Sequence, residues 1–303
     1  MKRVLITGAN GLLGQKLVLA LFPHFEVLAT ARQPRWYPAD TLPRDDAVAY
    51  RQLDITHLQQ CREVIDDFCP DVIVNAAAYT HVDACEEEKE LCWQVNVKGV
   101  EHLARVARKH MSLVVQLSTD YIFDGTAGPY GETDRPRPLG YYGKAKLAAE
   151  NAVRVAGIPY AIVRTNVLYG IGERVKTNFF LWVYNSLKAG QTIRVVTDQY
   201  NNPVLAEDLA EGIRLLIAQS GYGVYHMAGE DYLNRYEFAR AVARVFEFDE
   251  WRVQPITTAE LKQKAPRPMK GGLRIDKAKA DLGYQPRSIT QALEFLKSRL
   301  AES

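Results

Sequence analysis

The sequence predicts an α/β fold, namely a Rossmann-type doubly wound parallel sheet with a smaller C-terminal α+β lobe. Two observations support this prediction. In the first half of the chain, apolar runs of strand length alternate with helical patterns, which is typical of a parallel sheet covered by helices on both faces. Beyond Tyr169-Gly170 the strands become fewer and the loops more frequent. We therefore expect one domain over residues 1–168 and a second lobe over 169–303, some segments of which return to the sheet.

The composition excludes several classes of protein. The 303 residues are 47% hydrophobic and 24% charged, which is ordinary for a globular protein. A formal net charge of +2 gives no basis for binding nucleic acid or a membrane surface. No apolar run approaches the roughly 18 residues that suggest a membrane span, and Lys2-Arg3 leads directly into a strand rather than a signal peptide. The four cysteines include no CxxC pair, so we expect reduced thiols in a cytoplasmic protein without a bound metal.

A glycine-rich turn follows the first apolar strand. Val4–Thr7 is followed by Gly8-Ala9-Asn10-Gly11-Leu12-Leu13-Gly14 and then by an apolar helix through Leu21. Glycine allows a tight turn, a close approach of the backbone to a pyrophosphate, and close packing of the helix on the strand. The helix N-terminus would then present free N–H groups to the phosphates. The alternative is a structural turn that binds no ligand; the position between strand and helix favours phosphate binding.

The end of the second strand bears on the choice of dinucleotide. An NAD site usually places an acid here, where it binds the ribose 2′-hydroxyl. Strand Glu26–Thr30 is instead followed by Arg32, and an arginine suits a 2′-phosphate, so NADPH is expected, with NADH as the other possibility. Arg32 could equally be a solvated loop cation. Residues 33–47 read as a loop without periodicity.

Two more strands and a long helix complete the first part of the predicted sheet. Tyr50–Leu53 and Asp71–Asn75 are strands, and Glu86–His110 reads as one long helix. The second of these strands runs into Ala76-Ala77-Ala78. Such small residues would let the backbone lie against a flat cofactor, although a close contact between helix and strand would also explain them.

The centre of the chain carries the residues with a chemical signature. The strand Met111–Leu117 leads into Ser118-Thr119-Asp120-Tyr121, and Tyr142 and Lys146 lie four residues apart on a predicted helix. The two side chains therefore share a helix face. An ammonium beside a phenol favours the phenolate, so we expect Lys146 to lower the pKa of Tyr142 from about 10. Tyr142 is then a candidate proton donor to a carbonyl. A second pair, Tyr184 and Lys188, has no motif around it.

The second half alternates less regularly between helices and strands. A ligand is expected in the cleft between the two parts, at the carboxyl ends of the parallel strands. The expected helices lie near 174–189, 205–219, 234–246 and 290–300, and the expected strands near 192–196 and 223–227.

These motifs together resemble the extended short-chain dehydrogenase/reductase family, and within it the dTDP-4-dehydrorhamnose reductases. The resemblance covers nearly the whole chain, and its most specific part is Ser118-Thr-Asp-Tyr-Ile-Phe-Asp-Gly125. The other matching blocks are Thr7-Gly8-x-x-Gly11-x-x-Gly14, Asp54-Ile55, Asn75-Ala-Ala-Ala-Tyr-Thr-His-Val-Asp83, Pro129-Tyr130 with Glu132, Tyr142-Gly143 through Glu150, Val195-Val-Thr-Asp-Gln199 and Gly223-Val-Tyr-His-Met-Ala-Gly229.

The resemblance implies reduction of the C4 keto group of a nucleotide-linked 6-deoxyhexose by NADPH, in a homodimer. It implies that Thr119, Tyr142 and Lys146 are catalytic, residues 1–168 are the NAD(P)-binding Rossmann domain, and 169–303 are mainly the substrate-binding lobe. The cofactor would contact Gly8, Asn10, Gly11, Leu12, Leu13, Gly14, Arg32, Asp54, Ile55, Asn75, Ala76, Ala77, Ala78, Tyr142 and Lys146. The substrate would contact Thr119, Asp120, Tyr121, Asn166, Asn178 and Arg267, the last two at the diphosphate.

Departures from the family pattern leave alternatives open. Related dehydratases carry a glutamate where this chain has Tyr121, so reduction fits better than loss of water. Val167 stands where the family often has a tryptophan, and Asn201-Asn202-Pro203-Val204 replaces Gly-x-Pro-Thr. The alternatives are a reductase or epimerase acting on another nucleotide sugar, and a non-catalytic NADP-binding subunit that resembles the partner of methionine adenosyltransferase.

Overall fold

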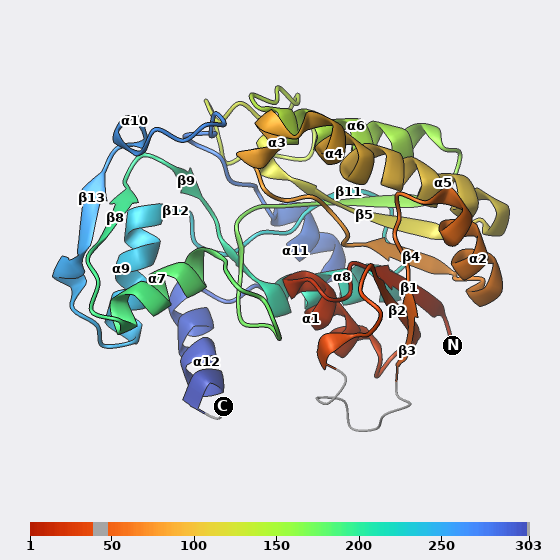
Figure 1. The fold of residues 1–303 in the computed structure, drawn as a ribbon, viewed down its shortest axis with the longest axis horizontal. Coiled ribbons are helices and arrows are strands. Elements are labelled where there is room, and N and C mark those ends of the chain that lie inside the picture. Colours follow the sequence, from red (N-terminus) through yellow and green to blue (C-terminus); the bar gives the residue numbers. More distant parts are fainter. Residues whose placement is uncertain (39–47, 302–303) are drawn as a thin grey trace.

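A parallel sheet forms the centre of the computed structural model, which describes residues 1–38 and 48–301 (Figure 1). Within that part of the chain the sheet has seven strands in the order β11-β6-β5-β4-β1-β2-β3. All neighbouring strands run parallel. Their bounds are β1 Arg3–Thr7, β2 Glu26–Ala31, β3 Ala49–Gln52, β4 Val72–Asn75, β5 Leu113–Thr119, β6 Tyr160–Thr165 and β11 Gly223–His226. The predicted doubly wound parallel sheet is confirmed. Residues 39–47 of the expected loop lie outside the described residues.

Helices cover both faces of this sheet, as Figure 1 shows. Each layer buries its own apolar cluster against the strands, because side chains of a parallel strand point alternately to either face. One layer contains α1 (Leu12–Leu21), α8 (Ala206–Ala218) and α11 (Asp276–Leu282); the other contains α2 (Leu58–Phe68), α5 (Gly99–His110) and α6 (Tyr141–Val155). The order of the strands reverses between β1 and β4, so the carboxyl ends there form the expected position of a ligand.

The single long helix expected over Glu86–His110 is wrong. The structure divides this region into α3 (Ala84–Glu87), α4 (Lys89–Trp93), a π-helical turn (Gln94–Lys98) and α5. The buried side chain of Asn96 explains the local geometry of the turn. Its Oδ1 accepts from the backbone N–H of Tyr79 at 2.9 Å, and its Nδ2 donates to the Tyr79 carbonyl at 2.9 Å. The turn thus binds the loop that follows β4, a long-range contact that periodicity does not reveal.

The C-terminal part contains a separate apolar cluster at one end of the molecule (Figure 1). Three helices and a parallel pair of strands enclose it, namely α7 (Phe179–Lys188), α9 (Arg235–Val245), α12 (Ile289–Ala301), β8 (Ile193–Val196) and β13 (Val253–Ile256). The short helix α10 (Thr258–Leu261) follows β13 in the chain. Two short pairs, β7 (Leu168–Tyr169) with β10 (Val204–Leu205) and β9 (Tyr200–Asn201) with β12 (Leu233–Asn234), complete the chain. Strand β11 and helix α8 return to the Rossmann sheet, while the boundary at residue 168 stays a prediction.

The helix expected near residue 174 begins at Phe179 instead. Asn178 is its N-cap, and its Oδ1 accepts the backbone N–H of Leu181 at 3.1 Å. Residues 170–178 therefore connect β7 to α7 without helical structure. Among the described residues, no helix is both long enough and apolar enough to cross a membrane.

Candidate active site

The glycine turn between β1 and α1 leaves room for a ligand at the helix N-terminus. Gly8 has φ +67°, and a Cβ added there would lie 2.7 Å from the backbone nitrogen of Ala77. A Cβ at Gly14 would lie 2.1 Å from the Gly8 carbonyl oxygen. Gly11 is the N-cap of α1 and offers no side chain to its first N–H groups. The turn is therefore a cradle that only glycine permits, and the unsatisfied N–H groups can bind phosphate.

Beside this turn lies the cofactor cavity, with a volume of about 730 Å³. Most of the predicted cofactor residues line this cavity, and they lie at the ends of four strands. The predicted cofactor residues that line this cavity are Gly8, Asn10, Gly11, Arg32, Asp54, Ile55, Ala76, Ala77 and Ala78. Asn75 does not face it: its Oδ1 accepts from Thr7 at 2.6 Å and its Nδ2 donates to Gln116 at 2.8 Å. Asn75 therefore connects strands inside the sheet.

A second space, the catalytic cavity of about 560 Å³, adjoins the cofactor cavity. It contains the other predicted cofactor residues except Asn75, three that also line the cofactor cavity, the three predicted catalytic residues, and five of the six predicted substrate residues, of which Thr119 is also a predicted catalytic residue. These are Gly11, Leu12, Leu13, Gly14, Ala76, Ala78, Thr119, Asp120, Tyr121, Tyr142, Lys146, Asn166 and Asn178. Gly11, Ala76 and Ala78 line both cavities, so a ligand bound along the carboxyl ends of the strands can extend from one into the other.

The predicted catalytic residues come from β5 and α6. Thr119 is the last residue of β5, and its hydroxyl accepts the backbone N–H of Tyr121 at 3.2 Å. Lys146 is buried, and its Nζ donates to the Leu117 carbonyl at 2.6 Å. Close packing brings the helix to the strand end, since a Cβ at Gly143 would lie 2.1 Å from the Tyr121 carbonyl oxygen. The structure thus brings together the predicted hydroxyl, phenol and ammonium.

The electrostatics of Tyr142 correct one expectation. Loss of hydration by burial raises the pKa of Tyr142 above its ordinary value, and the neighbouring Tyr121 raises it further. A hydrogen bond with Thr119 opposes this rise only partly. The predicted lowering by Lys146 is not seen in this structure, in which the lysine donates to the Leu117 carbonyl. Tyr142 is therefore held as a neutral phenol, the protonation state that a proton donor requires.

Two other groups of the catalytic cavity have shifted pKa values. Burial lowers the pKa of Lys146 to about 8, although the nearby Glu150 carboxylate acts in the opposite direction and raises it. Burial raises the pKa of Asp120 to about 6, although the backbone N–H of Gly272 and the cation of Arg235 favour its charged form. Both shifts follow from removing a charged group from water.

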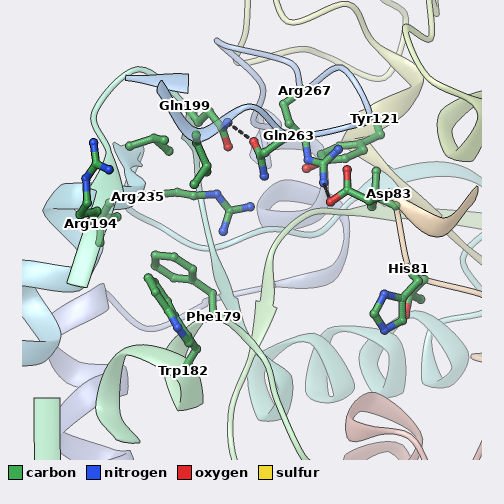
Figure 2. Close-up of a pocket in the computed structure, with 15 residues that line it drawn as sticks. His81, Asp83, Tyr121, Phe179, Trp182, Arg194, Gln199, Arg235, Gln263 and Arg267 are labelled. Carbon is green, nitrogen blue, oxygen red and sulfur yellow. Dashed lines mark hydrogen bonds and ion pairs between the residues drawn. The ribbon is translucent and has the colours of Figure 1, made fainter. Parts of the chain in front are cut away.

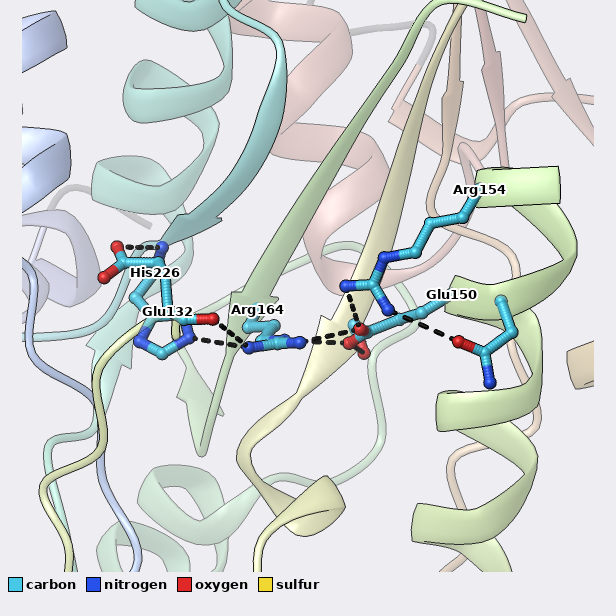
Figure 3. A network of polar contacts seen from close by, with 7 residues as sticks. Glu132, Glu150, Arg154, Arg164 and His226 are labelled. Carbon is cyan, nitrogen blue, oxygen red and sulfur yellow. Dashed lines mark hydrogen bonds and ion pairs between the residues drawn. The ribbon is translucent and has the colours of Figure 1, made fainter. Parts of the chain in front are cut away.

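A buried ion-pair network connects α6 to the neighbouring strand β6 (Figure 3). Its centre is Glu150, one helical turn after Lys146 and fully buried. Arg164 binds the carboxylate with two N–H groups, Nε to Oε1 at 2.9 Å and Nη2 to Oε2 at 2.8 Å. Ser118 donates its hydroxyl to Oε1 at 2.6 Å, and Arg154 donates to Oε2 at 3.1 Å. One carboxylate therefore connects α6 to the end of β5 and to β6.

The far side of this network holds a buried histidine, His226, whose backbone N–H donates to the Glu132 carboxylate at 3.1 Å. Arg164 also donates to His226 Nε2 at 3.3 Å, and His226 Nδ1 lies 3.1 Å from the carbonyl of Tyr130. Burial, together with the charge of Arg164, lowers the pKa of His226 to about 3. The imidazole is thus neutral, with Nδ1 donating and Nε2 accepting. Its role is to complete the hydrogen bonds of a buried arginine.

A third space, the distal cavity of about 500 Å³, continues from the catalytic cavity into the C-terminal part (Figure 2). Tyr121, Phe179 and Arg235 line both cavities. The other labelled residues that line it are His81, Asp83, Trp182, Arg194, Gln199, Gln263 and Arg267. Three adjoining cavities therefore form one path from the glycine turn to α7 and β8.

The two residues predicted for a diphosphate have other partners. Arg267 forms an ion pair with Asp83 at 2.9 Å and also donates to the Ala265 carbonyl. Asn178 caps α7 and donates its Nδ2 to the Gly170 carbonyl at 2.8 Å. Asn166 donates to Asn202 at 2.7 Å. All three line the path, but their polar groups also hold the fold.

Sequence reasoning missed Arg235. Its guanidinium lies 4.8 Å from the Phe179 ring centroid and reaches into the cavity of Figure 2. Arg194 pairs with Glu260 and Arg267 with Asp83, whereas no ion pair is found between Arg235 and a described carboxylate. The only sequence signal is the capping box of α9, Asn234 with Glu237, which places Arg235 at a helix N-terminus. That signal does not tell which cavity the helix faces.

Comparison with known proteins assigns the family. The sequence model described as the RmlD substrate binding domain matches residues 1–301. The chain belongs to this family. Membership of the RmlD family confirms the predicted resemblance, and the chain is therefore an oxidoreductase of this family.

Three of the similar proteins are a reductase sequence, an adenosyltransferase subunit and a reductase structure. A dTDP-4-dehydrorhamnose reductase of Aggregatibacter actinomycetemcomitans is 34% identical, over 98% of this chain and 99% of that protein. The methionine adenosyltransferase 2 subunit beta of Bos taurus is 32% identical, over 84% of this chain and 75% of that protein. A crystal structure of dTDP-4-dehydrorhamnose reductase from Bacillus anthracis in complex with NADP superposes with a TM-score of 0.88 at 31% identity, over 99% of this chain and 100% of that one.

Proposed function

We propose that the chain reduces the C4 keto group of a nucleotide-linked 6-deoxyhexose, and that the substrate is dTDP-4-dehydro-rhamnose, which becomes dTDP-rhamnose. The observation that supports this best is the convergence of Thr119, Tyr142 and Lys146 where the cofactor cavity meets the path toward the distal cavity. Hydride transfer needs a cofactor, a carbonyl and a proton donor at one point. The matching reductase relative supports the choice of sugar.

The cofactor is NADPH, and when bound it supplies the hydride. The residues present fit such a dinucleotide, because the Gly8–Gly14 turn is a cradle that a Cβ would fill. The free N–H groups at the start of α1 would hold the pyrophosphate, and Arg32 would face the 2′-phosphate. Ala76, Ala77 and Ala78 would lie beside the cofactor without side chains that obstruct it.

The side chains of the catalytic cavity divide the remaining work. Tyr142 holds a proton at its hydroxyl and donates it to the oxygen of the carbonyl as negative charge develops there. Thr119 donates a second hydrogen bond to that oxygen and so stabilises the charge. The Lys146 ammonium provides a positive charge next to the same point. Its burial among protein groups keeps it in one position.

The pKa of Lys146 leads to an expected pH dependence. The value of about 8 lies below that of an ordinary lysine, so the ammonium is lost as the pH rises through about 8. We expect kcat to be constant near pH 7 and to fall on the alkaline side with an apparent pKa near 8. A kcat profile measured at saturating substrate checks this. A profile that stays level to pH 10 would remove the need for the charge of Lys146.

Arg235 is our proposed ligand for the substrate diphosphate. It lies where the catalytic and distal cavities meet, and it has no ion pair with a described carboxylate. Phe179 and Trp182, with ring centroids 5.6 Å apart, offer apolar surface for a base beyond it. A guanidinium binds phosphate oxygens with two parallel N–H groups, so this position suits a nucleoside diphosphate.

Replacing Arg235 with glutamine is expected to raise KM for the nucleotide sugar by about 10- to 100-fold, with a much smaller effect on kcat. The reason is that the diphosphate is bound equally in the ground state and the transition state. Steady-state kinetics at fixed NADPH measures both constants. Arg240→Gln is the matched control, because Arg240 lies on the same helix and pairs with Glu250 at 2.7 Å. An unchanged KM in Arg235→Gln would contradict the assignment.

The proposed reaction is tested by NADPH consumption with purified protein and a panel of nucleotide 4-keto-6-deoxysugars. The panel includes the dTDP-linked precursor made with its coupling epimerase. The proposal is supported if NADPH is oxidised rapidly with that precursor and with no other member of the panel. Tight NADPH binding without turnover of any panel member would instead favour a binding subunit, as in the methionine adenosyltransferase relative. We also propose a homodimer, as the family resemblance implies, and a cytoplasmic location, which four free cysteines favour.

A further inference from the structure

The connection from β7 to α7, residues 170–178, passes between two of the cavities, and we name it the strap. Its side chains alternate. Arg174 and Lys176 line the cofactor cavity, whereas Val175 and Thr177 line the catalytic cavity. The alternation begins at a turn, in which the backbone N–H of Val175 donates to the Gly172 carbonyl at 3.2 Å. The strap thus brings two cations from the C-terminal half of the chain to the cofactor.

A buried glutamine holds the strap against helix α1. The Gln15 side chain makes a pair of hydrogen bonds with the backbone of Glu173, with Nε2 donating to the carbonyl at 2.9 Å and Oε1 accepting the N–H at 2.9 Å. Nε2 also donates to the Asn10 carbonyl in the glycine turn at 3.0 Å. The strap lies close, since a Cβ at Gly172 would be 2.9 Å from Gln15 Oε1. One side chain therefore fixes the strap relative to the phosphate turn.

Arg174 has an unusual backbone and a defined position. Its φ is +55°, a conformation that a residue other than glycine adopts only when its surroundings impose it. Its guanidinium lies 4.4 Å from the Tyr37 ring centroid. The Tyr37 backbone N–H in turn donates to Asn10 Oδ1 at 3.0 Å. Arg174 is thus stacked on the loop that follows β2, next to the glycine turn.

The charges around this point favour an anion. Arg32, Arg174 and Lys176 all line the cofactor cavity. Among the described residues, Asp54 is the one carboxylate that lines it with them, and its Oδ1 already accepts two hydrogen bonds from Thr56. The exposed Glu173 carboxylate forms an ion pair with Arg174 at 4.0 Å and is not among the described residues that line the cavity. Of the described residues that line the cavity, the cations therefore outnumber the acids, on the side where strand β2 ends.

We propose that Arg174 is a second arm of the site for the NADP 2′-phosphate, opposite Arg32, and that Gln15 is the positioning residue that holds it there. The inference rests on the cofactor assigned above. It gives a role to the residue with the strained backbone, and it assigns cofactor preference to a residue some 140 positions beyond the usual strand-end position. Lys176 adds charge to the same side of the cavity.

The test is a titration of the whole protein with NADPH and, separately, with NADH, without any sugar. Arg174→Gln is expected to raise Kd for NADPH about 10-fold or more and to leave Kd for NADH within about 2-fold, because only NADPH has the 2′-phosphate. Arg32→Ala should show the same selectivity. Arg252→Gln is the matched control, an arginine stacked at 4.5 Å on Trp251 outside the three cavities, and should change neither constant.

Equal losses for both cofactors in Arg174→Gln would overturn the proposal, since they would place the arginine on the shared pyrophosphate. Unchanged binding would overturn it as well. Gln15→Leu tests the positioning role: it should weaken NADPH binding, and it should weaken it much less when Arg174 is already glutamine. Fully additive losses would contradict that role. Because no sugar is present, an error in the proposed substrate leaves these results unchanged, whereas a wild type without NADPH preference would overturn this site.

Discussion

Replacing Tyr142 with phenylalanine is expected to lower kcat by about 100-fold or more and to leave NADPH binding nearly unchanged. The substitution removes only the hydroxyl, and with it the proton that the developing alkoxide needs. The structure strengthens this expectation, because burial raises the pKa of Tyr142 and keeps the phenol protonated. Phenylalanine retains the ring that meets Tyr121 edge to face, with centroids 5.9 Å apart. The loss is therefore one of chemistry and not of packing.

The measurement is single-turnover reduction of the best panel substrate, combined with a Kd for NADPH. The chain contains its own control, the second pair of a tyrosine and a lysine at the same spacing. In that pair the Lys188 ammonium lies 5.5 Å from the Tyr184 ring centroid, and Tyr184 packs against Phe246 in the C-terminal cluster. Tyr184→Phe should retain full activity. If Tyr142→Phe kept activity within a few-fold of wild type, the proton would have to come from another group.

Replacing Glu150 with glutamine is expected to lower the free energy of unfolding by about 3–5 kcal/mol. Glu150 is fully buried, and its carboxylate accepts from Arg164, Arg154 and Ser118 (Figure 3). Glutamine keeps the volume but removes the charge, so the buried Arg164 loses its compensating partner. It also places an N–H₂ group against donors that need an acceptor. Both effects act on a site with almost no contact with water.

Denaturation by urea, followed by circular dichroism, measures this change. Glu211→Gln is the matched control, because Glu211 also accepts two N–H groups of an arginine, Arg214, but lies half exposed on α8. An exposed pair contributes about 1 kcal/mol or less, so the control should change little. A loss below about 1 kcal/mol in Glu150→Gln would show that the network contributes less than its burial indicates. In the folded fraction, the alkaline limb of the kcat profile should move to lower pH, because Glu150 raises the pKa of Lys146.

The parts of the fold that follow from local pattern were predictable from the sequence. Val4–Thr7, the glycine turn and the helix after it depend on neighbouring residues, and the structure places them as β1, the cradle and α1. The end of β5 and the pair Tyr142 and Lys146 belong to this group, because a strand end and a helical spacing of four are both short-range features. The family could be recognised for the same reason, since its motifs are short.

Other features depended on contacts between distant segments. The helix expected over Glu86–His110 is interrupted where Asn96 binds the backbone of Tyr79. Asn178 and Arg267 were expected at the substrate. Asn178 caps α7 and Arg267 forms an ion pair with Asp83, whereas Arg235 faces the path through the cavities. No periodicity in the sequence shows which polar group has a partner elsewhere in the chain.

The sequence by itself determined the family and the doubly wound sheet, and it located the residues that we propose as catalytic, because each of these follows from short motifs of neighbouring residues. Only the tertiary structure decided the protonation of Tyr142, since its pKa depends on the burial that helix α6 and strand β5 create together. The same holds for Gln15 and Arg174, whose roles depend on a helix at the start of the chain meeting a strap far along it. Burial and long-range contact are properties of the folded chain, and so are the pKa values and binding sites that follow from them.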